Sequence, residues 1–150
     1  MSDVAAEPLE TSAAASGTPV ESIGDVVVAV DVGATHFQAG LVTARGVLID
    51  RARAPIEVDD GPESQYTALA SIVTEMLERA ESRHEVVVRA IGLTSGGHAS
   101  RGLELVSPLS VPGWRNFPLR SRLEELSGHA VHGDLDAKAL ALAEGWLGAA

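Results

Sequence analysis

The sequence predicts an α/β fold in which helices flank a mixed five-stranded sheet, made of a three-strand meander and two parallel strands. Three observations lead to this prediction. Residues 25–54 hold three strand-like segments joined by two short connections, which is typical of an antiparallel meander. A helical segment and a second apolar run follow, and this succession favours a parallel pairing with the first strand. Residues 130–135 add a last short strand.

The first strand is expected over residues 25–31, where β-branched residues run without polar alternation. Such a run indicates a strand that is buried on both faces of its sheet. The second strand is expected over residues 36–43. The turn at 44–46 leads into the third strand, residues 47–54, which Pro55 ends.

A helix is expected to begin at Pro62, because proline suits the first turn of a helix. Apolar residues then recur at helical spacing and predict a face packed on the core: Tyr66, Leu69, Val73, Met76, Leu77 and Ala80. Residues 86–93 form the second buried strand. An amphipathic helix over 116–126 ends at Gly128, and a final helix is predicted over 137–147.

Composition limits the kinds of protein that this chain can be. Its 150 residues, 45% of them apolar, suffice for one domain with a real core. The net charge of −10, without a Lys/Arg cluster, argues against binding to nucleic acid and to anionic membrane surfaces. The absence of cysteine excludes disulfides and cysteine-ligated zinc within this chain. No segment approaches the roughly 20 apolar residues of a membrane span.

Residues 1–24 are rich in Ala, Ser, Thr, Glu and Pro and contain no Lys or Arg. We predict a disordered acidic tail, because this composition cannot bury enough apolar surface to offset the entropy of ordering. The segment lacks the basic start and apolar centre of a secretory signal, so we expect a cytoplasmic protein.

Residues 31–35 (DVGAT) follow the first strand and suit a phosphate loop. Gly33 lets backbone N–H groups approach an anion, and Thr35 adds a hydroxyl. Asp31 would repel a phosphate, so its expected task beside one is to hold a divalent cation or that cation's water shell. The structural alternative is a strand-to-turn corner in which Asp31 closes an Asx turn.

Residues 94–98 (TSGGH) come at the end of the second buried strand, where open α/β sheets place their ligands. Gly96 and Gly97 allow the backbone to pass close to a small molecule, but a plain turn explains them as well. His98 either binds a substrate hydroxyl or caps the turn.

Asp136 stands where the final predicted helix begins, so the helix dipole favours its ionised form. An ionised Asp can take the proton from a hydroxyl during phosphoryl transfer. The alternative is a helix N-cap, a common task of Asp. Asp134, two residues earlier on the same side of the strand, is the rival base.

Four motifs, in this order and spacing, resemble the amino-terminal lobe of the ROK family of sugar kinases and related repressors: residues 31–35, 91–98, 111–119 (VPGWRNFPL) and 136–148 (DAKALALAEGWLG). This family has the ribonuclease H-like fold of actin-type ATPases, and the resemblance runs from Asp25 to the last residue. It implies that the terminal phosphate of ATP passes, with Mg²⁺, to a hydroxyl of a hexose or N-acetylhexosamine. By position, Asp31, Gly33 and Thr35 match the first phosphate motif, Asp136 the catalytic Asp, and Gly97 the loop that lines the sugar pocket.

The sequence departs from the family pattern at His36, Ser110, Leu135 and Lys138. Leu135 matters most, because the family generally has Asn there and Leu cannot offer a sugar an amide hydrogen bond. Either the sugar differs or the role of this residue has moved.

Family members are considerably longer, and their remaining part carries the second phosphate loop, most adenosine contacts, further sugar ligands and a cysteine-rich zinc motif, none of which occurs here. We therefore expect residues 25–150 to be an amino-terminal lobe without its carboxy-terminal lobe, in a truncated product, a fragment or one half of a split protein. Phosphoryl transfer needs both sides of a cleft, so one lobe should have little activity. The expected partners are a sugar, ATP, and either a second copy or the missing lobe.

Two other functions stay open. One is a noncatalytic sugar-binding or regulatory lobe, although a repressor needs a DNA-binding domain and residues 1–24 are too short and acidic for one. The other is a remnant that binds nothing tightly.

Overall fold

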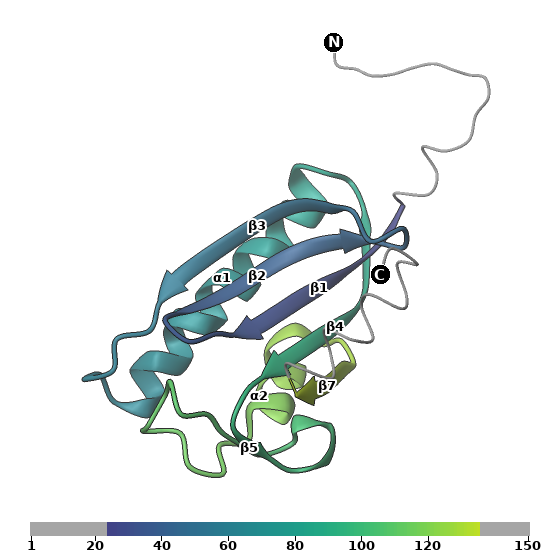
Figure 1. Ribbon diagram of the computed structural model, residues 1–150. Coiled ribbons are helices and arrows are strands. Elements are labelled where there is room, and N and C mark those ends of the chain that lie inside the picture. Colours follow the sequence, from purple (N-terminus) through teal and green to yellow (C-terminus); the bar gives the residue numbers. More distant parts are fainter. Residues whose placement is uncertain (1–23, 136–150) are drawn as a thin grey trace, which may run out of the picture.

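The computed structural model describes residues 24–135 and shows one twisted sheet with helices behind it (Figure 1). The strands of this sheet are β1 (Asp25–Val32), β2 (His36–Thr43), β3 (Leu48–Pro55), β4 (Val87–Ser95) and β7 (Val131–Leu135). Their order is β3-β2-β1-β4-β7. The pairs β1–β2 and β2–β3 are antiparallel, whereas β1–β4 and β4–β7 are parallel. The predicted meander with two added parallel strands is therefore confirmed.

The other elements lie between these strands: α1 (Pro62–Ser82), α2 (Leu119–Ser127), the short strands β5 (His98–Ala99) and β6 (Val106–Ser107), and the 3₁₀ helix η3 (Arg101–Leu103). α2 begins at Leu119 rather than at residue 116, because Asn116 has a left-handed φ of 51° and Phe117 pairs with Val106 instead. Neither α1 nor α2 combines the length and apolar character needed to cross a membrane. The tail predicted before Gly24 and the helix predicted over 137–147 lie outside the described residues.

The core lies between one face of the sheet and the helices α1 and α2 (Figure 1). Alternate residues of β1 point into it and are almost fully buried: Val26, Val28, Val30 and Val32. The residues predicted for the apolar face of α1 pack into the same core, and Ile72 joins them. Leu77 is only partly buried. On the opposite face Val27 is half-buried and Ala29 exposed. The prediction that β1 is buried on both faces is wrong for residues 24–135, because the described helices all cover the same face.

An aromatic stack anchors the loop between β6 and α2. Trp114 is fully buried, and its ring stacks on Phe37 and Phe117 at centroid distances of 5.5 and 4.5 Å. Its Nε1 donates a hydrogen bond to the Pro62 carbonyl, 3.1 Å away. Since Phe37 belongs to β2 and Pro62 opens α1, this one side chain fixes the loop to the core.

Asp50 joins β3 to the end of α1. Its carboxylate accepts hydrogen bonds from Arg79 and His84, each at 2.9 Å, and from Arg83 at 3.4 Å. The hydrogen bond from His84 and the nearby Arg79 hold the pKa of the Asp50 carboxyl below its usual value, against the effect of burial.

Candidate functional site

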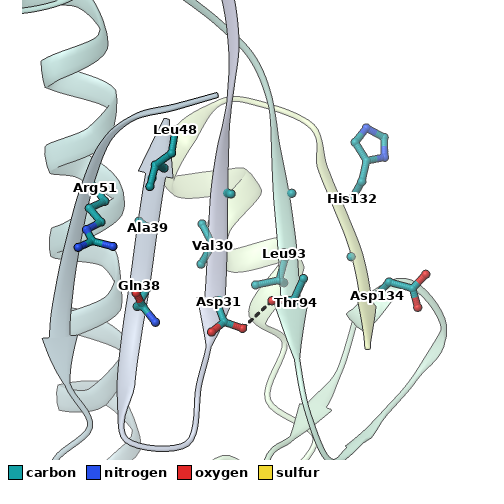
Figure 2. Close-up of a pocket in the computed structure, with 14 residues that line it drawn as sticks. Val30, Asp31, Gln38, Ala39, Leu48, Arg51, Leu93, Thr94, His132 and Asp134 are labelled. Atoms are coloured by element: carbon teal, nitrogen blue, oxygen red, sulfur yellow. Dashed lines mark hydrogen bonds between the residues drawn. The ribbon is translucent and has the colours of Figure 1, made fainter. Parts of the chain in front are cut away.

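The parallel strands β1, β4 and β7 all end at one edge of the sheet, and a polar side chain stands near the end of each. Asp31 is in register with Thr94, and Thr94 with Asp134. Figure 2 shows these three side chains in one row, with Gln38 on the other side of Asp31. Thr94 Oγ1 donates a short hydrogen bond of 2.6 Å to Asp31 Oδ1. The sequence-predicted Asp31 is therefore held by a partner that sequence reasoning did not single out.

Residues 33–35 form the tight connection between β1 and β2. The Gly33 N–H donates to the His36 carbonyl at 3.0 Å, and a Cβ at position 33 would lie 2.8 Å from that oxygen. This close backbone approach requires glycine. Thr35 Oγ1 lies 2.9 Å from His36 Nδ1 at an exposed position. Asp31 bonds to Thr94 and not to a following N–H, so the Asx turn considered from the sequence is not formed.

A cleft of about 430 Å³ lies at this edge of the sheet. Three segments contribute its lining: residues 32–34 after β1, residues 96–97 after β4, and residues 108–110 after β6. Gly97 has a φ of +81°, and a Cβ there would lie 3.0 Å from both Pro108 Cα and the Ser107 carbonyl oxygen. The structure thus brings Gly33 and Gly97, from the two glycine loops predicted as binding sites, into one cleft.

Other predicted site residues lie outside this lining. His98 is exposed and pairs with Ser107 in the small β5–β6 hairpin. Thr35 stands just beyond the loop that lines the cleft. Asp31 and Asp134 instead line a second hollow, of about 630 Å³, on the sheet face opposite the helices (Figure 2). Asp136 lies outside the described residues.

Asp31 has the chemistry of a single protein ligand for Mg²⁺. Within residues 24–135 no three His, Asp or Glu side chains are grouped so that they could hold a metal ion. Mg²⁺ does not need such a group, because it keeps several waters and is commonly bound by one or two carboxylates together with substrate phosphates. Thr94 occupies Oδ1 of Asp31, which leaves Oδ2 for a cation or its water shell.

Comparison with known proteins places this architecture in a family. A family model described as the ROK family matches residues 27–150. The chain belongs to the ROK family. Among curated relatives, this ROK chain is 30% identical to a glucokinase of Thermotoga maritima over 125 residues and 31% identical to an N-acetylmannosamine kinase of Shigella boydii over 116 residues. These alignments cover 82% and 77% of the chain.

Solved structures agree with this assignment. A ROK hexokinase from Thermus thermophilus matches 79% of the chain with a TM-score of 0.65 and 36% identity. A ROK glucokinase from Streptomyces griseus, solved with glucose and AMPPNP, matches 83% with a TM-score of 0.68 and 25% identity. The chain spans only 37–38% of the length of these four proteins. The predicted family and its actin-like ATPase fold are confirmed.

Proposed function

We propose that this ROK chain supplies the amino-terminal part of a site that transfers the terminal phosphate of ATP to a hydroxyl of a hexose or N-acetylhexosamine. The observation that carries the proposal is the meeting of Gly33 and Gly97 in one cleft, with Asp31 fixed beside it. The relatives named glucokinase and N-acetylmannosamine kinase support this class of substrate. The glucokinase that was solved with AMPPNP supports ATP as the phosphate donor.

The phosphate side of the site is assigned to the loop after β1. The Gly33 N–H is already bonded to the His36 carbonyl. The backbone N–H groups that follow it and the Thr35 hydroxyl would donate to the phosphates of ATP, and Asp31 would hold Mg²⁺ or its water shell. When bound, Mg²⁺ neutralises charge on the phosphates during transfer. The hydrogen bond from Thr94 keeps the Asp31 carboxylate in one orientation. A fixed carboxylate loses less entropy when it binds a ligand.

The sugar side is assigned to the loop after β4. The backbone around Gly97 would line the sugar pocket, and the exposed His98, which follows Gly97 in the chain, would reach a sugar hydroxyl. We assign the catalytic base to Asp136, which would bind the acceptor hydroxyl and take its proton as the phosphate arrives. Asp134 is the competing assignment, because it is in register with Thr94, the hydrogen-bond partner of Asp31.

Phosphoryl transfer relies on charged and polar groups on both sides of a closed cleft. The chain corresponds to little more than a third of its curated relatives, since it spans 37–38% of their length. We therefore expect the 150-residue chain alone to bind ligands weakly and to turn over little. The alternative, a noncatalytic sugar-binding or regulatory lobe, predicts sugar binding that never leads to phosphate transfer.

The test is a chimera in which residues 27–150 replace the matching segment of the Thermotoga maritima glucokinase. ADP release is measured with ATP, Mg²⁺ and, in turn, glucose, N-acetylglucosamine and N-acetylmannosamine. We expect turnover with at least one sugar and its loss in Asp136→Asn, with Asp134→Asn as the matched control.

Isothermal titration of the same sugars separates the outcomes. A folded chimera that binds a sugar without turnover would favour the noncatalytic lobe. A folded chimera that binds no sugar would contradict both the proposed kinase site and the noncatalytic sugar-binding lobe. Loss of turnover in Asp134→Asn but not in Asp136→Asn would reassign the base.

A further inference from the structure

The loop between β1 and β2 carries two polar side chains that bond to each other. Thr35 Oγ1 and His36 Nδ1 lie 2.9 Å apart, which is a hydrogen-bond distance. The Gly33 N–H donates to the His36 carbonyl at 3.0 Å and thereby holds the backbone of this loop in a tight turn. The imidazole of His36 is therefore in contact with the hydroxyl that the proposed function assigns to the phosphates of ATP.

This hydrogen bond can run in two directions, and only one of them leaves the Thr35 hydroxyl free to donate to a phosphate. A threonine hydroxyl has a single proton to donate, whereas a histidine ring nitrogen either carries a proton or accepts one. If Nδ1 of His36 carries no proton, Thr35 donates to it and presents only oxygen lone pairs to the ligand. If Nδ1 carries a proton, it donates to Thr35 Oγ1, and the hydroxyl proton is free for a phosphate oxygen.

A fully protonated imidazole makes the second arrangement stronger. Both ring nitrogens then donate, and a charge-assisted hydrogen bond is about twice as strong as a neutral one. A hydroxyl that accepts such a hydrogen bond is polarised and becomes a better donor itself. Histidine is the side chain that gains and loses this proton between about pH 5 and pH 8. The state of His36 can therefore change how strongly Thr35 binds an anion.

The cleft beside this loop offers an anion no charged side chain. Within residues 24–135, the side chains that line the cleft at 32–34, 96–97 and 108–110 are all uncharged. The whole chain has a net charge of −10, which repels an anionic ligand. A protonated His36 would place a positive charge next to the loop that is assigned to the phosphates.

Charged side chains of both signs surround the position of His36 on the sheet. His36 and Gln38 lie on the same face of β2, and Gln38 is in register with Asp31 on β1 and with Arg53 on β3. The loop that follows β3 adds the exposed Glu57. Carboxylates and a guanidinium act on a nearby proton in opposite directions. A pH dependence of ligand binding therefore has to be assigned by substitutions in the loop itself.

We propose that His36 is a positioning residue for the phosphates: with a proton on Nδ1 it donates to Thr35 Oγ1, so that the Thr35 hydroxyl donates to a phosphate oxygen of ATP. This inference rests on the proposed function and adds to it a control of nucleotide binding by the protonation of one side chain. Because coupling between two bound species is reciprocal, phosphate binding also favours the proton on Nδ1.

NMR of the 150-residue chain, labelled with ¹⁵N in its histidine rings, tests both sides of this coupling. The probe is AMPPNP with Mg²⁺, titrated at about pH 6 and at about pH 8. We expect AMPPNP to move the His36 Nδ1 signal toward that of a protonated nitrogen. AMPPNP binding that leaves this signal unchanged would overturn the inference and leave the proposed phosphate site intact.

Substitutions then separate an effect through Thr35 from a direct effect of the imidazole. AMPPNP itself titrates in this pH range, so the ratio of its affinities at the two pH values is compared between variants that share the ligand. We expect this ratio to favour low pH about five- to tenfold more in the unchanged chain than in Thr35→Val, which lacks the hydroxyl but keeps His36. Thr35→Ser should behave as the unchanged chain, and His36→Asn as Thr35→Val.

His129→Asn is the matched control for loss of a histidine, because His129 lies just before β7, at the opposite edge of the sheet, and should keep the ratio of the unchanged chain. The same ratio in Thr35→Val as in the unchanged chain would overturn the inference, because His36 would then not act through the hydroxyl. Absence of AMPPNP binding at both pH values would overturn the proposed function and this inference with it.

Discussion

Gly97→Ala tests whether the cleft depends on the close approach of its two walls. Gly97 has a left-handed φ of +81°, and an added Cβ would lie 3.0 Å from Pro108 Cα and from the Ser107 carbonyl oxygen. Both neighbours are backbone atoms, which cannot rotate away as the end of a side chain can. The substitution therefore adds a steric cost to the conformational cost of the left-handed backbone.

Gly128→Ala is the matched control, because Gly128 has a similar φ of +72° and no atom within 4 Å of an added Cβ. The left-handed conformation costs alanine about 1–2 kcal/mol, and reduced freedom of the unfolded chain returns about 0.4–1 kcal/mol. We therefore expect a net loss of about 1 kcal/mol for Gly128→Ala. Gly97→Ala should lose about 2–4 kcal/mol, because overpacking adds about 1–3 kcal/mol.

Thermal unfolding followed by circular dichroism measures both changes. For a domain of this size about 1 kcal/mol corresponds to roughly 4 °C, so the melting temperature should fall by about 4 °C for Gly128→Ala and by about 8–16 °C for Gly97→Ala. Sugar binding should also weaken in Gly97→Ala and not in Gly128→Ala, since Gly97 lines the cleft and Gly128 does not. Equal melting temperatures for the two variants would refute the steric reasoning.

Three further predictions concern the ring stack of Trp114, the ion pairs of Asp50, and the hydrogen bond between Thr94 and Asp31. Trp114→Ala should cost about 3–5 kcal/mol in chemical denaturation, while Trp114→Phe should cost less because it keeps the ring stack; equal losses would contradict this account. Because the pKa of Asp50 is lowered, its contribution to stability is complete above its unfolded pKa of about 4 and is lost as pH falls through the folded pKa. Between about pH 5 and pH 3, the melting temperature should therefore depend less on pH in Asp50→Asn than in the unchanged chain. An identical pH dependence in the two proteins would show that Asp50 does not contribute to the loss of stability in acid. In the glucokinase chimera, Thr94→Val should weaken Mg²⁺-dependent ATP binding, whereas Thr94→Ser keeps the hydroxyl and should bind ATP normally. Similar ATP binding by the two variants would show that the hydrogen bond to Asp31 does not position the carboxylate.

The sequence predicted the fold closely because most elements carry strong local signals. Alternating and helical patterns of apolar residues predicted the bounds of the strands and helices to within a few residues. Pro62 and Gly128 marked helix ends. Failures came where distant parts of the chain decide the outcome. Asn116 adopts a left-handed φ, and Phe117 pairs with Val106, so α2 starts later than its apolar pattern indicates.

The candidate site was predicted in part for the same reason. Gly33 and Gly97 stand at strand ends, and the parallel strands necessarily bring those ends to one edge. The hydrogen bond between Thr94 and Asp31 depends on the register of β1 with β4. One residue of slip would place Thr94 on the other face of the sheet, and a single sequence does not specify register to that accuracy.

The aromatic stack also holds one wall of the candidate cleft in place. Val111 and Trp114, just beyond the cleft residues 108–110, are fully buried, so that wall is continuous with the hydrophobic interior and cannot shift without loosening it. Leu109, by contrast, is 83% exposed at the lip. Under the proposed function, Leu109 is therefore the cleft residue whose size can be changed with least effect on the core, and Leu109→Ala would test whether this side chain limits the bulk of the sugar that binds.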